Sequence, residues 1–433
     1  MKNDFSLSEK NMKKGKILCT YPWYYTITKS FCVTIRVERR LKENIDGDAL
    51  RRAVDITMKR YPYLGKRLRK SWTRYYLVRN SLPVVVKENE GKINLGGKEA
   101  NYHQFAFTYS GNSIFLNQTH GIFDGRGSNP FLQTLLHYYC QFCYGENYED
   151  RNVNYIDTPI NPEEYADPYL HWSPKSDKSF RKAYKPCKAL KLEKEGLVTP
   201  SAMHYRRILI NEAELMHLCK SSDASPNTAL SVLLCRAIRK LHPEATLPII
   251  PSLFCDARPA FDSSISHYSL AAPLCISYDN RMDTMDFSLQ NTIFRGKLMV
   301  VSDASAMQHI HRQMKRAYEY MNLLPTLKSK LLVGKLCRKY SFNICTFFIS
   351  YARNSSFGGC DRHIELFSPL LYMQGSGLSL EISTVDGNFL VTWLQEWKED
   401  VYLDAFLREC DVIGLKYILS DRGEFVPPGY QLE

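Results

Sequence analysis

The sequence has no apolar run that approaches the roughly 20 residues required to span a bilayer, so we expect no membrane span. Its first residues, Met1–Ser6, are polar and lack the apolar segment of a signal peptide. The 13 cysteines are scattered and odd in number, whereas a secreted chain would be expected to pair them. Together these features predict a cytoplasmic protein with reduced thiols.

Several motifs of catalysis and binding are also absent. The chain has no Gly-x-Ser-x-Gly nucleophile elbow, no phosphate-binding P-loop and no zinc-finger spacing. His137, Cys140 and Cys143 follow one another at intervals of three residues, which suits either a metal site or a partly buried helix face that carries cysteine as a small apolar residue. We favour the helix face and predict no metal site.

The charge balance is positive, with 57 Lys and Arg against 45 Asp and Glu and a formal net charge of +12. Three interpretations are open: a basic surface that keeps the protein in solution, attraction of a phosphate-bearing cofactor, and binding of nucleic acid or of an anionic membrane. Lys and Arg are spread along the chain, with local clusters such as Lys66–Lys70, and no basic amphipathic helix is evident. We therefore expect no nucleic-acid partner.

The first half of the chain alternates strand and helix signals. Apolar residues at helical spacing predict one helix that Asp46 caps and Pro62 ends, and another that runs from an Asn129 N-cap to Gly145. A glycine-bearing turn is expected at 91–97. Alternation of apolar and polar residues predicts strands at 31–39, 74–79, 82–87, 104–109 and 113–119.

The second half has the same coarse strand–helix–strand order. Residues 150–200 are rich in Pro, Asp, Tyr and Lys without periodicity, so we interpret them as a linker between two α/β halves, 1–185 and 186–433. Helices are expected from Glu212, from Ser225, over 303–340 with an interruption near Pro325, and over 400–417. Strands are expected at 204–210, 247–255 and 271–278, and at 344–351, 363–368, 378–384 and 388–394, the last four closing one sheet.

The strongest local signal is the segment Thr119–Gly127, which contains His120, Asp124 and Gly125. Its three glycines argue against a helix and favour a tight loop after the preceding strand. Histidine has a reference pKa of about 6.5, so an imidazole there can take a proton from a hydroxyl, an amine or a thiol. The spacing also allows Asp124 to orient His120 or to fix the loop through another partner. A lone His beside a glycine-rich turn with a capping Asp would give the same pattern.

The segment resembles the active-site motif His-His-x-x-x-Asp-Gly of the chloramphenicol acetyltransferase-like superfamily, which includes condensation domains of peptide synthetases, BAHD acyltransferases and alcohol acetyltransferases. Thr119 stands at the first His, and His120 matches the second, catalytic one. The BAHD-specific Asp-Phe-Gly-Trp-Gly motif has only a loose echo in Ser356–Gly359, which favours the alcohol acetyltransferase or condensation-like branches. Further segments match the superfamily in order and spacing over nearly the whole chain: Asn44–Leu64, Asn227–Leu230, Cys255–Pro259 and Leu378–Trp393.

The resemblance implies an α/β fold of two chloramphenicol acetyltransferase-like sandwich halves with a tunnel between them. His120 would lie near the middle of the tunnel as general base, and Gly125 belongs to the same loop. In the superfamily the motif Asp forms a structural pair with an Arg of a later Asp-x-Arg segment, and Asp124 and Arg258 match these residues. Ser350, at the end of a strand that resembles one lining the tunnel, is a candidate to stabilise the oxyanion.

The implied reaction is direct transfer of an acyl group from a thioester to a hydroxyl or amine acceptor, without a metal, a permanently bound cofactor or a covalent intermediate. Acyl-coenzyme A is the expected donor, with a thioester on an acyl carrier protein as the alternative in a condensation-like protein. A catalytically silent relative that binds a carrier or another partner protein is a third hypothesis. We expect small-molecule donor and acceptor and a monomeric protein.

Overall fold

Local signals at the helix ends account for where several helices begin and stop. The computed structural model describes residues 22–27, 33–90, 92–145, 148, 153–166, 187–192, 203–261, 265–341, 344–352, 358–372 and 377–431. The Asp46 carboxylate accepts hydrogen bonds from the backbone N–H groups of Asp48 and Ala49 and so caps α3 (Gly47–Arg60). Ser225 and Thr228 form a capping box at the start of α7 (Pro226–Leu241). These predicted helix starts are confirmed.

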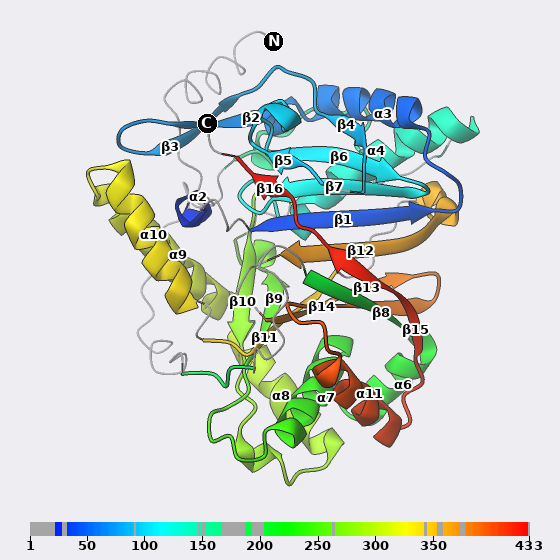
Figure 1. Cartoon of the computed structure of the whole chain (residues 1–433), viewed down its shortest axis with the longest axis vertical. Helices are drawn as coiled ribbons and strands as arrows, with labels where there is room; N and C mark the ends of the chain where they lie inside the picture. The colour runs from blue at the N-terminus through cyan, green and yellow to red at the C-terminus, as the bar shows by residue number, and fades with distance from the viewer. Residues whose placement is uncertain are drawn as a thin grey trace.

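A five-stranded sheet, in the order β12-β1-β7-β6-β4, forms the first lobe (Figure 1). Helices α3 and α4 (Gly125–Tyr144) pack over it, and the buried core between them includes Leu50, Phe105 and Phe131. The strand bounds are β1 Thr34–Leu41, β4 Val86–Glu88, β6 Phe105–Ser110, β7 Ser113–Thr119 and β12 Ile364–Tyr372. The predicted hairpin of β6 and β7 is confirmed by their antiparallel register.

The prediction that the strand near 363–368 belongs to the second sheet is wrong. This strand is β12, which pairs antiparallel with β1 at the edge of the first sheet, so that Ile35 faces Leu371. Leu371 packs into the core of the first lobe, whereas Leu370 packs against Leu394 of the second. Alternation of apolar and polar residues shows which face of a strand is buried, but it does not show which other strand pairs with its edge. Because β12 is buried on both faces, its sequence does not predict its partner strand.

A seven-stranded sheet, in the order β10-β9-β11-β13-β14-β8-β15, forms the second lobe. The central strands β9, β11 and β13 run parallel, and helices α6 (Glu212–Ser221), α7, α8 (Phe287–Val301) and α11 (Val401–Val412) lie at this end of the molecule (Figure 1). The strand bounds are β8 Met203–Asn211, β9 Pro251–Asp256, β10 Ala271–Cys275, β11 Phe347–Tyr351, β13 Leu378–Val385, β14 Asn388–Gln395 and β15 Ile418–Phe425.

Outside the two large sheets, the described residues also form a helical hairpin and two short two-stranded sheets. The long basic stretch forms α9 (Ala304–Leu323) and α10 (Leu327–Ser341), with the expected break near Pro325, and the short α2 (Pro22–Thr26) lies against α10.

The final helix ends at Val412 instead of Tyr417, since Gly414 adopts a left-handed φ of 74° and the chain turns into β15. The short strands are β2 Lys66–Lys70, β3 Tyr75–Arg79, β5 Asn94–Leu95 and β16 Gly429–Tyr430.

The two lobes are joined by a partly buried ion network. Arg207 of β8 binds Glu38 of β1 and also Asp421 of β15, with 2.6 Å between its Nη1 and the Asp421 carboxylate. Arg40 bridges the same two carboxylates at 3.1 and 3.0 Å. Four charges in one network hold the lobes in a single register, since a displaced partner would leave a buried charge unpaired.

Some predictions concern residues that the structure does not describe. The predicted boundary at 185 and 186, most of the predicted linker 150–200, and Ser356 with its neighbour Phe357 lie outside the described residues. Within the described ranges, no helix combines the length and the apolar character that a bilayer crossing requires.

Candidate active site

His120 follows the last residue of β7, where the sheet of the first lobe ends. Its backbone N–H donates to the carbonyl of Val33 at 3.0 Å, which continues the sheet pairing by one residue. The side chain is partly exposed, and its Nδ1 lies 3.5 Å from the hydroxyl of Ser269. Burial lowers the pKa of His120, while the charge of Asp124 and a hydrogen bond between the ring and its own backbone act in the opposite direction. A neutral imidazole at pH 7 can therefore accept a proton.

Asp124 lies four residues further on and is almost fully buried. Its Oδ1 accepts from the Gly127 N–H at 2.7 Å, which caps α4, and its Oδ2 accepts from the Leu270 N–H at 2.9 Å. Both oxygens also accept from Arg258, at 2.8 Å from Nη2 and 3.2 Å from Nη1. Burial alone would raise the pKa of Asp124, but the charge of Arg258 and these hydrogen bonds lower it below its ordinary value. The carboxylate is thus ionised and fixed.

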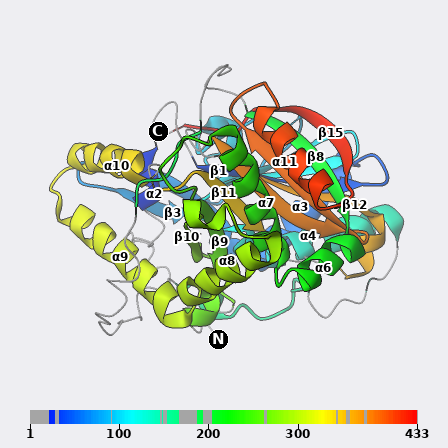
Figure 2. The ribbon, with the colours of Figure 1, turned by 90° about the horizontal axis from the view of Figure 1, so that it is seen from below.

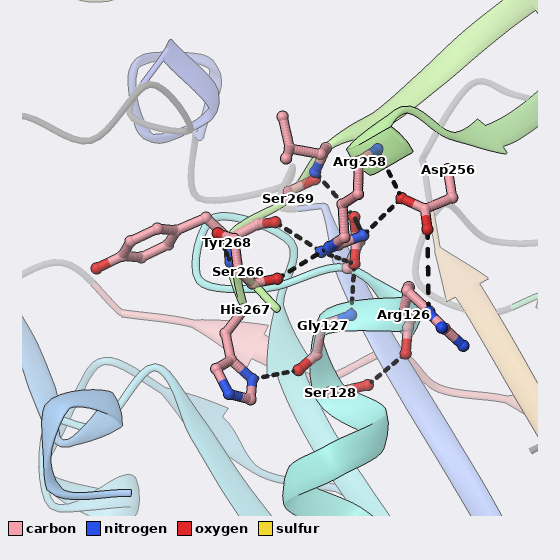
Figure 3. Close-up of polar contacts among 12 residues, drawn as sticks. Arg126, Gly127, Ser128, Asp256, Arg258, Ser266, His267, Tyr268 and Ser269 are labelled. Carbon is pink, nitrogen blue, oxygen red and sulfur yellow. Dashed lines mark hydrogen bonds and ion pairs between the residues drawn. The ribbon is translucent and has the colours of Figure 1, made fainter. Parts of the chain in front are cut away.

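Arg258 opens a 3-10 turn (Arg258–Phe261) directly after β9 and is 2% exposed. Besides Asp124, its guanidinium donates to the carbonyls of Ser266 and Tyr268, at 2.9 and 2.7 Å, and to the carboxylate of Asp256 at 2.9 Å (Figure 3). The planar fork therefore ties three segments together: the end of β9, the loop before β10 and the start of α4. This makes the ion pair a structural clamp on the loop that carries His120.

The prediction of a helix start at Asn129 is wrong, because α4 begins at Gly125 with Asp124 as its N-cap. The glycines suggested a loop from propensity alone, but the cap bond and the Arg258 clamp stabilise the first turn. Gly127 is required by close packing, since a Cβ there would lie 2.1 Å from the carbonyl oxygen of His267. Gly125 has no such constraint, because a Cβ at that position would have no neighbour within 4 Å.

A second polar layer behind this clamp was not found from the sequence. His267 is buried, and its Nδ1 lies 2.6 Å from the carbonyl oxygen of Gly127 (Figure 3). The His267 backbone N–H donates to the carbonyl of Glu164, whose carboxylate accepts from Arg60 at 2.7 and 2.9 Å and from the hydroxyl of Tyr63. No local motif marks these residues, because they come from three separate segments, around 60–63, 164 and 267, that meet only in the folded chain.

Ser350 lies apart from the clamp, on β11 of the second lobe. It is in register with Phe254 of β9 and with Glu381 of β13, and its hydroxyl is hydrogen-bonded to the Glu381 carboxyl. Burial raises the pKa of Glu381 to about 8, and the hydrogen bond to Ser350 offsets part of this shift. Glu381 was not singled out from the sequence, although a carboxyl group between Leu380 and Ile382 in an apolar strand is an available signal.

Ser350 and Glu381 occupy the face of the second sheet that points toward the first lobe. Leu380 and Ile382 belong to the core on the far side of the sheet, and side chains alternate along a strand. Phe348, two residues before Ser350, packs in the same cluster as Ile122 and Phe123 of the His120 loop. The face that carries Ser350 is therefore directed to the lobe that carries His120.

His137, Cys140 and His363 lie in ordinary packing environments. The ring of His137 makes edge contacts with Tyr138 and Tyr155, and Cys140 is buried beside Cys360, with a hydrogen bond between the two side chains. His363 stacks on Tyr144 with ring centroids 3.9 Å apart. Among the described residues, no group of three or more His, Cys, Asp and Glu is arranged to hold a metal ion.

No family model and no curated protein sequence matches this chain, but solved structures do. Polyketide synthase associated protein 5 from Mycobacterium tuberculosis aligns over 91% of this chain and 98% of its own, with 15% identity and a TM-score of 0.59. TRI101 of F. graminearum, solved with coenzyme A and deoxynivalenol, aligns over 91% and 98% with 11% identity and a TM-score of 0.59. The first condensation domain of the CDA synthetase aligns over 92% and 97%, with 12% identity and a TM-score of 0.57.

These likenesses extend over nearly the whole of each chain. The expected fold of two α/β lobes is therefore confirmed, because the chain shares it with these solved structures.

Proposed function

We propose that this protein is an acyltransferase that moves an acyl group from a thioester to a hydroxyl or amine, with His120 as general base. The observation that carries the proposal is the geometry of one loop. A partly exposed imidazole with a lowered pKa follows β7, and a buried Asp124–Arg258 pair holds the following turn. A base needs both a neutral imidazole and a fixed position relative to the reacting atoms.

The reaction follows from the two nitrogens of His120. Nδ1 is directed toward Ser269, so Nε2 is the nitrogen that would accept the proton of the acceptor. As the acceptor oxygen or nitrogen loses its proton to Nε2, it attacks the thioester carbonyl and forms a tetrahedral oxyanion. Collapse of this intermediate breaks the carbon–sulfur bond, and the imidazolium returns the proton to the thiolate. Acyl group, proton and charge balance without a metal or a covalent enzyme intermediate.

Ser350 is the proposed donor to the oxyanion, with Glu381 as its positioning residue. The ionised carboxylate of Glu381 accepts from Ser350, but at pH 7 a carboxyl group with a pKa of about 8 is mostly protonated, and in that neutral form it can donate its hydrogen to the Ser350 hydroxyl oxygen. The hydroxyl hydrogen of Ser350 is then available for the oxyanion. Removal of a single oxyanion donor typically costs about 10²–10³ in kcat.

Coenzyme A is the proposed carrier of the acyl group. The proposal is supported by the fold shared with TRI101, which was solved with coenzyme A, and by a net charge of +12 that attracts phosphates. The likeness to a condensation domain keeps a carrier-bound thioester as the competing donor. The two are separated when the same acyl group is supplied on free coenzyme A and on an acyl carrier protein, at matched concentration across a salt series. We expect turnover of the free thioester that weakens as salt rises, and a rate about a hundredfold higher with the carrier would reverse the assignment.

The central test is a panel of acyl-coenzyme A donors incubated with a metabolite extract and analysed by mass spectrometry. The matched control is His217→Ala, because His217 is an exposed histidine on α6 of the second lobe. His120→Ala should lower turnover by about 10²–10⁴ with an unchanged melting temperature, whereas His217→Ala should leave both unchanged. More than half of the wild-type rate in His120→Ala would exclude the general-base role. If the wild type neither transfers an acyl group nor slowly hydrolyses the donor, the protein is a catalytically silent binding protein instead.

A further inference from the structure

The positive charge of the chain is concentrated in two segments. Residues 66–79 contain six Lys and Arg and no acid, and residues 312–341 contain eight Lys and Arg and one acid, Glu319. The rest of the chain has 43 Lys and Arg against 44 Asp and Glu, so these two segments carry the whole of the +12 net charge. A basic surface that served only solubility would have no need of such concentration.

The two segments meet in the folded chain. The first is the β2–β3 hairpin, and the second is most of the α9–α10 helical hairpin; both views show α9 and α10 at one edge of the molecule (Figures 1 and 2). The N–H of Leu327, at the start of α10, donates to the carbonyl of Trp72 in the β2–β3 turn at 2.9 Å. Among the described side chains, the exposed cations of the two segments are Arg69, Lys70, Arg79, Arg316, Lys328 and Lys335.

Large apolar side chains project from the same surface. Trp72 at the hairpin turn is 82% exposed, and Leu323 at the end of α9 is 78% exposed. On α10, Leu332 and Leu336 are 62% and 61% exposed, and their spacing places them on one helix face with Lys328 and Lys335. The opposite face of α10 packs on α2, since a Cβ at Gly334 would lie 2.2 Å from the carbonyl oxygen of Tyr25. The exposed face is therefore directed outward.

We infer that this surface, formed by the β2–β3 turn and the outer face of α9–α10, docks on lipid bilayers that contain anionic lipid. Lys and Arg meet the phosphates of the headgroups while Trp and Leu enter the boundary with the acyl chains. A nucleic acid would bind the cations but offers no apolar layer for Leu332 and Leu336. An acidic protein would need a groove that fits both the β2–β3 turn and the outer face of α10, because both project outward. A bilayer surface deforms around them and needs no such groove.

The surface is connected to the His120 loop by buried packing. Tyr24, Tyr25, Tyr75, Tyr268 and Met321 form a buried cluster below it, with partly buried Leu327 and Leu331 of α10 packed against them. The Tyr24 ring lies against Gly121, where a Cβ would approach it to 2.7 Å. Helix α10 and this cluster therefore lie between the surface and the His120 loop. The inference does not depend on the proposed acyl transfer, because docking is measured without any substrate.

The test is co-sedimentation of the full chain with vesicles of phosphatidylcholine alone and of phosphatidylcholine with about one third phosphatidylglycerol. One variant replaces the apolar side chains (Trp72→Ser, Leu332→Ser, Leu336→Ser), and a second reverses the charges (Lys70→Glu, Lys328→Glu, Lys335→Glu). The control, Val412→Ser with Leu419→Ser, removes apolar side chains that are 67% and 54% exposed on the other lobe. All substituted side chains are exposed, and circular dichroism verifies the fold of each variant.

We expect the wild type and the control to bind the anionic vesicles at least about tenfold more strongly than the neutral ones, and both surface variants to lose about tenfold or more. Added salt should weaken the binding of the wild type. Equal partitioning of wild type and both variants would overturn the inference. The inference would also be overturned if the protein did not bind vesicles but bound a DNA duplex or an acidic acyl carrier protein, and both surface variants lost that binding. The surface would then be assigned to that partner.

Discussion

The buried pair of Asp124 and Arg258 offers a quantitative test of how the His120 loop is held. Truncation of one partner of a buried, hydrogen-bonded ion pair costs about 3–5 kcal/mol. Asp124→Ala falls at the lower end, about 3 kcal/mol, because Arg258 keeps the carboxylate of Asp256 and the carbonyls of Ser266 and Tyr268. Arg258→Ala falls at the upper end, about 5 kcal/mol, since the Asp124 carboxylate keeps two backbone N–H donors but has no cation.

The double variant should lose about 5 kcal/mol instead of the sum of about 8, which gives a coupling energy of about 3 kcal/mol. The assay is urea denaturation followed by circular dichroism at pH 7, with turnover measured on the same samples. At that pH the pair is intact, because the folded-state pKa of Asp124 is lowered and its contribution is lost only as pH falls through that value. Activity should fall with stability in all three variants.

The control is the same cycle on Asp48 and Arg51 of α3, which form an ion pair with side chains 90% and 54% exposed. Solvent screens such a pair, so its coupling should be hardly measurable. Losses at Asp124 and Arg258 that add to within about 0.5 kcal/mol would refute the clamp, because independent sites behave in that way.

Three further predictions concern single positions. Gly127→Ala should destabilise the fold by about 1–3 kcal/mol through its clash with the His267 carbonyl, whereas Gly125→Ala, with open space, should be neutral or gain up to about 1 kcal/mol; equal effects in urea melts would contradict the packing argument. The acid limb of kcat/KM should have a midpoint below the ordinary histidine value of about 6.5, since burial lowers the pKa of His120, and a midpoint above 7 would disprove this. In the folded protein Glu381 stays neutral up to about pH 8, whereas in the unfolded chain it ionises near pH 4.3, so the free energy of unfolding should fall by about 3–5 kcal/mol as pH rises between these values. Glu381→Gln should flatten that part of the stability–pH curve and retain most activity. An unchanged curve would show that the carboxyl group is not buried as described.

Much of the architecture follows from local patterns in the sequence. Capping residues such as Asp46 and Ser225, the left-handed Gly145 and the alternation of β6 and β7 act within a few residues, so short-range physics determines those ends. The motif segments matched the superfamily in order, and this was enough to predict the two-lobed fold. The contact of Asp124 with Arg258 required the resemblance as well, since 134 residues separate the two.

Other features arise only when distant segments meet. The first turn of α4 forms in spite of its glycines because Arg258, from the second lobe, stabilises the Asp124 cap. The edge position of β12 depends on which strand edge is open in the assembled lobes, and no periodicity encodes that choice. The raised pKa of Glu381 comes from burial between two lobes, and the basic surface comes from the contact of two segments that lie more than 200 residues apart. The sequence by itself determines the helices and strands, their caps and the choice of His120 as the candidate base. Burial and long-range pairing exist only in the folded chain, and they decide which residues hold the His120 loop and how the pKa of His120 is shifted.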